Sequence, residues 1–144
     1  MGRNSSFHSL YFRNYPLANS VILMYDIKQK ESLKECNYYA EKIKELCDED
    51  IEVILLGNNQ SFLFSGSTIE REREVSFEEG ESFAKLNNYQ FMEVSSETKE
   101  GVKEAGEIAI WMALKNKRKR DNLKLMKENN NKYKGNKNSN CLIS

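Results

Sequence analysis

Three short apolar runs, separated by longer segments of mixed character, dominate the pattern of the chain. The first two runs, residues 20–25 and 51–56, are rich in branched aliphatic residues and show little alternation of apolar and polar positions. This pattern is typical of strands that are buried on both faces of a parallel sheet. A third run, residues 90–94, predicts another strand.

The segments between and after these runs carry apolar residues at helical spacing. Between residues 26 and 47 such a stripe, which includes Cys36 and Cys47, predicts a helix. Ser76-Phe-Glu-Glu79 is a capping box and predicts a helix that runs to about Leu86. Thr98 is expected to cap a last helix. The apolar stripe of this last helix is Val102, Ala105, Ile108, Ala109 and Met112.

Strands that alternate with helices predict an open, mostly parallel α/β sheet. Ligands of such sheets bind in the loops at the carboxyl ends of the strands, here residues 26–30, 57–61 and 95–98. A chain of 144 residues with 39% hydrophobic content supports one modest core. We therefore expect one domain, residues 1–114, followed by a tail, residues 115–144.

Charge is divided unevenly between these two parts. Residues 1–114 carry 12 Lys or Arg and 20 Asp or Glu, whereas residues 115–144 carry 10 and 2. The tail is rich in Asn and Lys and poor in apolar residues, so we expect it to be disordered. A basic tail binds either nucleic acid or an anionic membrane surface, and charge does not decide between them. Its basic cluster is Lys117, Arg118, Lys119 and Arg120.

The last four residues, Cys141-Leu-Ile-Ser144, match a prenylation box, and a terminal Ser favours farnesyl. One prenyl chain anchors a protein weakly, and the basic cluster supplies the second signal that stable anchoring needs. We therefore expect a prenyltransferase as a partner and a location at the cytoplasmic face of membranes, with part of the protein in the cytosol. The alternative is a chance cysteine on a nucleic-acid-binding tail, for which no aromatic platform or recognition motif is evident.

The N-terminal residues Met1-Gly-Arg-Asn-Ser-Ser6 fit the loose pattern for myristoylation of Gly2. If the N-terminus is a truncation point, the match to the myristoylation pattern is a coincidence, and we favour this interpretation. No apolar stretch approaches the roughly 20 residues that cross a bilayer, so we expect attachment to be peripheral or through lipid.

A set of motifs follows a fixed order along the chain. They are Phe7-His-Ser-Leu10, Asn14-Tyr-Pro-Leu-Ala18, Leu23-Met-Tyr-Asp-Ile27, Glu31-Ser-Leu33, Arg73-Glu-Val-Ser-Phe-Glu-Glu-Gly80 and Phe91-Met-Glu-Val-Ser-Ser96. In this order they resemble the C-terminal two-thirds of Rab-type small GTPases, over about residues 7–114. The resemblance implies a partial P-loop NTPase-like fold that lacks its first strands and phosphate loop. It also implies a role in vesicle or endomembrane traffic, with trafficking effector proteins as partners.

The resemblance further implies two loops that would contact a guanine base. In the family the first loop reads Asn-Lys-x-Asp, and the Asp selects guanine; here it reads Asn58-Asn59-Gln60-Ser61. The loss of a charged acceptor weakens nucleotide binding by several kcal/mol. The second loop, Ser-Ala-Lys in the family, reads Ser95-Ser96-Glu97. The expected remnant of the nucleotide site is Asn58, Ser61, Ser95 and Ser96.

The sequence also lacks the phosphate loop, the switch threonine and the magnesium-binding Asp of the family. By register, Arg3 and Asn4 stand at the family's Gly and water-orienting Gln. We therefore expect no catalytic residue, no metal site and no GTP hydrolysis; GTP or GDP with magnesium is implied only if the family function is retained. The main hypothesis is a prenyl-anchored Rab-like trafficking protein with a degenerate nucleotide site. The alternatives are an active GTP-binding switch and, less favoured, a nucleic-acid-binding protein.

Overall fold

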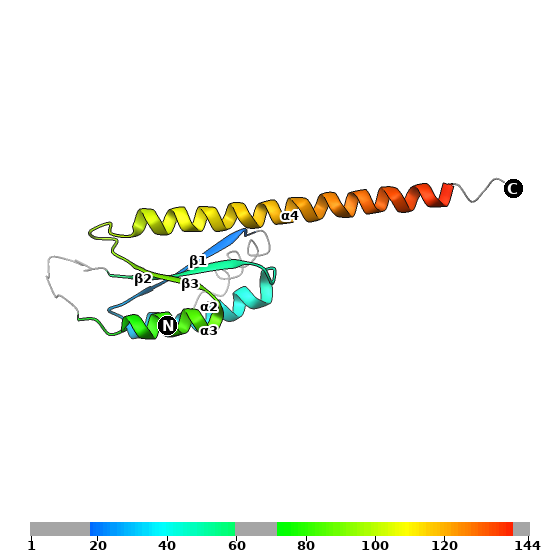
Figure 1. Ribbon diagram of the computed structural model, residues 1–144. Helices are drawn as coiled ribbons and strands as arrows, with labels where there is room; N and C mark the ends of the chain where they lie inside the picture. The colour runs from blue at the N-terminus through cyan, green and yellow to red at the C-terminus, as the bar shows by residue number, and fades with distance from the viewer. Residues whose placement is uncertain (1–17, 60–71, 140–144) are drawn as a thin grey trace, which may run out of the picture.

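The computed structural model describes residues 18–59 and 72–139. Their three strands form one parallel sheet in the order β1-β2-β3, and helices α2 and α3 cover one face while α4 covers the other (Figure 1). This confirms the predicted α/β class with parallel strands that alternate with helices. The elements are β1 (Ser20–Asp26), α2 (Lys30–Leu46), β2 (Glu52–Asn58), α3 (Phe77–Asn87), β3 (Gln90–Val94) and α4 (Val102–Ser139).

The register of the sheet brings the carboxyl ends of all three strands to one level. Asp26, the last residue of β1, pairs with Asn58 at the end of β2, and Asn58 pairs in turn with Val94 at the end of β3. The loops that follow the three strands therefore start side by side along one edge of the sheet.

The two longer strands differ in burial. Residues 53–58 of β2 are buried throughout, as the unalternating apolar run predicts. In β1 only Leu23 and Tyr25 are buried, whereas Ile22 and Met24 are 50% and 53% exposed. The prediction that β1 is buried on both faces is therefore wrong. Helix α4 contacts β1 near Ser20, whose hydroxyl donates to the Ala109 carbonyl (3.1 Å), but its apolar cluster is formed with residues of β2 and β3 and does not include Ile22 or Met24.

The core under α2 and α3 is packed around Tyr25 and Cys36. Cys36 is almost fully buried in this core, and Cys47 packs against it from the end of α2, which confirms both as packing residues. Burial raises the pKa of the Cys36 thiol to about 11 and that of the Tyr25 phenol to about 12. Both groups are therefore neutral at physiological pH.

Local signals determine the ends of α3. The Ser76 hydroxyl accepts a hydrogen bond from the Glu79 main-chain N–H (3.1 Å), and the Glu79 carboxylate accepts one from the Ser76 N–H (2.9 Å). The predicted capping box is thus confirmed. At the other end Asn88 takes the left-handed conformation (φ 58°), which Asn tolerates better than most residues and which stops the helix.

The start of α4 does not follow the prediction. The helix begins at Val102, and Thr98 lies in the preceding loop, where its main-chain N–H donates to the Ser95 hydroxyl (3.1 Å). The chain then passes through positive φ angles at Lys99 (65°) and Gly101 (70°) before it becomes helical. The prediction that Thr98 caps α4 is therefore wrong, because Thr98 belongs to a turn that begins at Ser95.

Helix α4 also extends further than the sequence predicts, because it continues past Leu114 to Ser139 and projects beyond the sheet (Figure 1). Residues 115–139 were expected to be disordered. No proline interrupts the segment, and many of its residues are strong helix formers. No helix within the described ranges is long and apolar enough to cross a membrane.

Contacts with the acidic turn before β2, defined here as residues 48–52 and so including the first residue of the strand, hold the first part of this extension. Lys115 pairs with Glu52, Lys119 with Asp50, and Arg120 with Asp48 (2.8 Å). The Asn116 side chain, which is buried, donates to the Asn19 carbonyl (2.8 Å). Lys119 and Arg120 of the basic cluster therefore stabilise the packing of α4 against the domain.

Gly80→Ala tests the packing between α3 and the sheet. A Cβ at Gly80 overlaps the Tyr25 hydroxyl and lies 2.8 Å from Cζ of Phe91, so we expect the free energy of unfolding to fall by about 1–3 kcal/mol. Urea denaturation followed by circular dichroism measures the change.

Gly106→Ala is the matched control, because a Cβ at this helical position meets no atom within 4 Å. This substitution should raise the free energy of unfolding by about 0.5–1 kcal/mol, the usual gain from Gly to Ala inside a helix. If the two substitutions change the free energy of unfolding equally, the close approach of α3 to Tyr25 is contradicted.

Candidate functional site

Asn58 is the buried polar residue at the carboxyl edge of the sheet. Its main-chain carbonyl accepts a hydrogen bond from the Ile27 N–H (3.1 Å), directly after β1. The Ile27 carbonyl accepts in turn from the N–H groups of Glu74 and Val75 (2.9 Å each). The segment before α3 is thereby bonded to the same edge.

The Asn58 side chain extends this connection to the loop after β3. Its Oδ1 accepts from the Ser96 main-chain N–H (3.0 Å), and its Nδ2 donates to the Ser96 hydroxyl (3.2 Å). The next residue, Asn59, donates its main-chain N–H to the Val94 carbonyl (2.7 Å). Three of the four predicted remnant residues, Asn58, Ser95 and Ser96, therefore lie together, and Ser61 lies outside the described residues.

The loop after β3 uses its own polar groups to hold its shape. The Ser95 N–H donates to the Glu100 carbonyl (3.0 Å), while the Glu100 N–H donates to the Thr98 hydroxyl (3.4 Å). Ser95 and Ser96 belong to the second loop that the resemblance assigns to the guanine base, and their main-chain N–H groups are both used inside the protein. These internal hydrogen bonds order the loop without a ligand.

Acidic side chains add to this edge. Glu97 is exposed at the position where the Rab-type loop carries Lys. Asp26 orders the loop after β1, because its Oδ1 accepts from the Lys28 N–H (2.9 Å). The edge as described is therefore better suited to hold its loops together than to attract an anionic ligand.

An ion pair that sequence reasoning missed lies beside these loops. The Arg73 guanidinium donates to both carboxylate oxygens of Glu93 on β3 (2.8 and 2.7 Å) and to the Val75 carbonyl (3.0 Å). The hydrogen bond to Glu93 raises the pKa of Arg73 above its usual value. The alternating Arg and Glu residues before the capping box gave no signal for this partner, because the pairing depends on which strand lies nearby.

The basic cluster lies at the opposite end of the sheet from Asn58. Lys119 and Arg120 pair with Asp50 and Asp48 before β2, whereas Lys117 and Arg118 are exposed. The sequence indicated a membrane surface as the partner of the basic cluster and did not predict this pairing, although the acidic residues Asp48, Glu49 and Asp50 were a signal for it. Cys141 lies outside the described residues.

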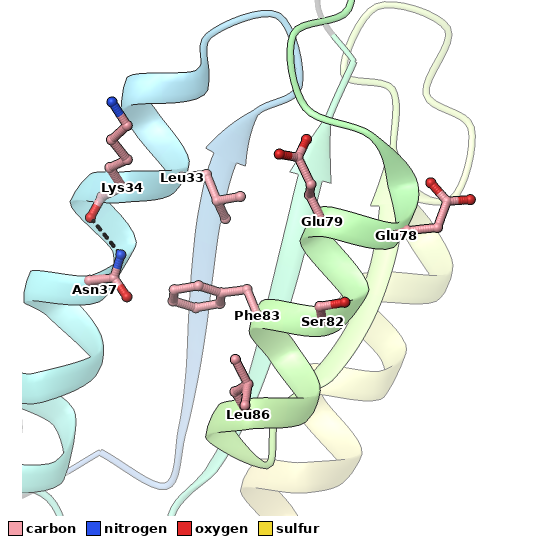
Figure 2. Close-up of a pocket in the computed structure, with 8 residues that line it drawn as sticks. All are labelled: Leu33, Lys34, Asn37, Glu78, Glu79, Ser82, Phe83 and Leu86. Carbon is pink, nitrogen blue, oxygen red and sulfur yellow. Dashed lines mark hydrogen bonds between the residues drawn. The ribbon is translucent and has the colours of Figure 1, made fainter.

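A groove of 450 Å³ separates α2 from α3, and Figure 2 shows Leu33 and Phe83 facing each other across it. Lys30 and Glu79 form an ion pair near one end (2.7 Å). The groove offers mainly apolar contact, with polar and charged side chains along its sides. In the described ranges no three His, Cys, Asp or Glu side chains are placed to hold a metal ion. The remaining lining residues are Lys34, Asn37, Glu78, Glu79, Ser82 and Leu86.

Asn58→Ala tests the connection between the two loops. Removal of both side-chain hydrogen bonds should lower the free energy of unfolding by about 1–2 kcal/mol and increase amide exchange at Ser96 by about tenfold. Asn59→Ala is the control: its side chain is exposed and its main-chain hydrogen bond survives, so we expect a change within about 0.5 kcal/mol. Unchanged exchange at Ser96 in Asn58→Ala contradicts this role.

Comparisons with known proteins agree with this geometry. The model of the Ras family matches residues 2–114. The chain is 31% identical to the GTP-binding protein YPT52 of Saccharomyces cerevisiae over 116 residues, which cover 71% of this chain and 48% of that protein. It is 33% identical over 98 residues to the Ras-related protein Rab-4 of Dictyostelium discoideum, with 68% and 44% covered.

The chain thus spans about half the length of these relatives. The parallel strands and alternating helices agree with part of the small-GTPase fold, as predicted. The order of the motifs, the sheet and the similarity to two Rab-type relatives lead to one assignment: the chain belongs to the Rab group of the Ras family.

Proposed function

We propose that this protein is a membrane-attached member of the Rab group that acts in vesicle or endomembrane traffic through contacts with effector proteins. In this proposal the base-contacting loops have a structural role and the chain does not act as a GTP-hydrolysing switch. Membrane attachment depends on a prenyl group at Cys141 and on basic residues near it.

The observation that carries the first part is the use of Asn58. Both polar ends of its side chain are bonded to Ser96, so the residue keeps two strand ends and their loops in place without a ligand. The neighbouring positions have lost the Lys and the Asp of the family pattern, since Asn59 and Ser61 stand there. What remains is the part of the motif that supports the fold.

The electrostatics of the edge support the same proposal. A guanine nucleotide carries several negative charges, and Glu97 places another negative charge at the second loop. In the family pattern Lys occupies this position. A like charge next to an anionic ligand lowers its affinity, so this edge favours partners other than a nucleotide.

A second function, guanine-nucleotide binding by the whole molecule, is kept as the alternative because the two Rab-type relatives are about twice as long as the part that matches. One is named a GTP-binding protein. In this alternative the nucleotide is GTP or GDP with magnesium.

Titration of the full chain with a fluorescent GTP analogue in magnesium buffer tests the first proposal. We expect no saturable binding of the analogue at micromolar concentrations. GDP should displace the analogue no better than ATP does. Asn58→Ala should leave this result unchanged, and circular dichroism checks that both proteins are folded. Tight binding that GDP but not ATP displaces supports the alternative instead.

Incubation of the full chain with farnesyl diphosphate and farnesyltransferase tests the attachment. The enzyme should join one farnesyl group to the Cys141 sulfur as a thioether and release diphosphate, and mass spectrometry measures the product. Cys141→Ser should abolish the modification, whereas Cys47→Ser should leave it intact. Modification that persists in Cys141→Ser contradicts the assignment of the site.

A further inference from the structure

The two sides of α4 differ in what they contact. One side packs on the sheet through a seam of Ala105, Ala109, Met112 and Asn116, all buried. These residues follow one another at intervals of three or four, so they form one stripe along the helix. The seam explains how α4 is held and leaves its opposite side without a partner among the described residues.

Four large apolar side chains are exposed on that opposite side. They are Ile110, Trp111, Leu114 and Leu125, here called the outer stripe. At about 100° of rotation per residue they fall within an arc of about 100°, away from the seam. Trp111, for example, is 62% exposed. Such a concentration of exposed apolar side chains on one helix face is typical of an interaction surface.

The basic residues near the outer stripe form two sets. Lys115, Lys119 and Arg120 pair with the acidic turn before β2, as described above. Lys117 and Arg118 take part in no ion pair within the described ranges. At about 100° of rotation per residue Lys117 lies at one margin of the outer stripe, and Arg118 lies within it, beside Trp111 and Leu114. Between residues 110 and 125 Asp121 is the only acidic residue. Asp121 also falls within the arc of the outer stripe, so the surface combines exposed apolar side chains with an excess of positive over negative charge.

We propose that the outer stripe lies in the headgroup region of an anionic lipid bilayer, with α4 parallel to the membrane plane. Tryptophan and aliphatic side chains enter the boundary between headgroups and acyl chains, while Lys and Arg extend to the phosphates. Charge complementarity selects this occupant: the excess of positive charge along residues 110–125 repels a second copy of the same surface, whereas anionic lipids neutralise it.

This inference rests on the proposed membrane attachment and specifies its geometry. Helix α4 ends at Ser139, two residues before Cys141. From Trp111 to Ser139 the helix rises about 42 Å at 1.5 Å per residue. A prenyl group and the outer stripe reach the same bilayer only when the helix lies flat. In that orientation the sheet stands on the membrane through α4, while the groove between α2 and α3 faces away from it.

The test uses Trp111, the only tryptophan of the chain, as the reporter. Farnesylated full-length protein is titrated with vesicles of phosphatidylcholine alone or with added phosphatidylserine. We expect the emission of Trp111 to shift to shorter wavelength, and brominated lipids to quench it, when the anionic lipid is present. Co-sedimentation with the same vesicles measures binding independently of the reporter.

Two double variants separate the apolar and basic contributions. Ile110→Asp with Leu114→Asp should abolish the Trp111 shift and weaken vesicle binding about tenfold or more. Leu86→Asp, on α3, is the control for an apolar-to-charged change, because Leu86 is 85% exposed and lies across the sheet from α4. Lys117→Gln with Arg118→Gln should also weaken binding about tenfold. Lys34→Gln with Lys85→Gln, on α2 and α3, is its control.

Each other outcome overturns the inference. If the farnesylated chain binds vesicles while Trp111 emission and quenching stay unchanged, the prenyl group and distal residues carry the attachment and the outer stripe does not. If the emission shift depends on protein concentration without lipid, the outer stripe joins copies of the chain. If the farnesylated chain binds no vesicles, the proposed membrane attachment fails as well.

Discussion

The three parallel strands end side by side at one edge of the sheet, and the rest of the described structure depends on this arrangement. The buried side chain of Asn58 stabilises that edge. Asn58 is bonded through its main chain to the residue after β1 and through its side chain to the loop after β3. A buried amide must find partners for its donors and acceptor, and here Ser96, in the loop after β3, accepts from the amide nitrogen and donates to the amide oxygen. The same residue thus satisfies its own polar groups and keeps the edge of the sheet ordered.

The other end of the sheet is held by charge. The acidic turn before β2 and the basic start of the extended α4 neutralise each other through three ion pairs. Exposed ion pairs contribute little individually, and their cooperation with the buried Asn116 makes the contact specific. The ion pairs join an acidic part of the chain to a basic part whose charges are equal and opposite, so that the net charge is zero.

Elements with local signals were predictable from the sequence. The capping box defined α3, and the apolar run at residues 90–94 gave the bounds of β3. The exposed side of β1, the loop around Thr98 and the length of α4 were not predictable, because each depends on contacts between distant residues. The sequence identified Asn58, Ser95 and Ser96 as neighbours through a family resemblance, and only the structure shows that their polar groups bond to one another. Ser61 and Cys141 remain predictions.

Helix α4 runs without interruption from the loop after β3 to Ser139, and this continuity gives it the properties of a lever. The part beyond Arg120 adds about 28 Å to the portion that contacts the sheet. A tilt of about 10° at the docked portion displaces the far end by about 5 Å, simply because the arm is long and rigid. Small rearrangements in the seam beneath the helix are therefore magnified into changes in where the last residues of the chain can reach.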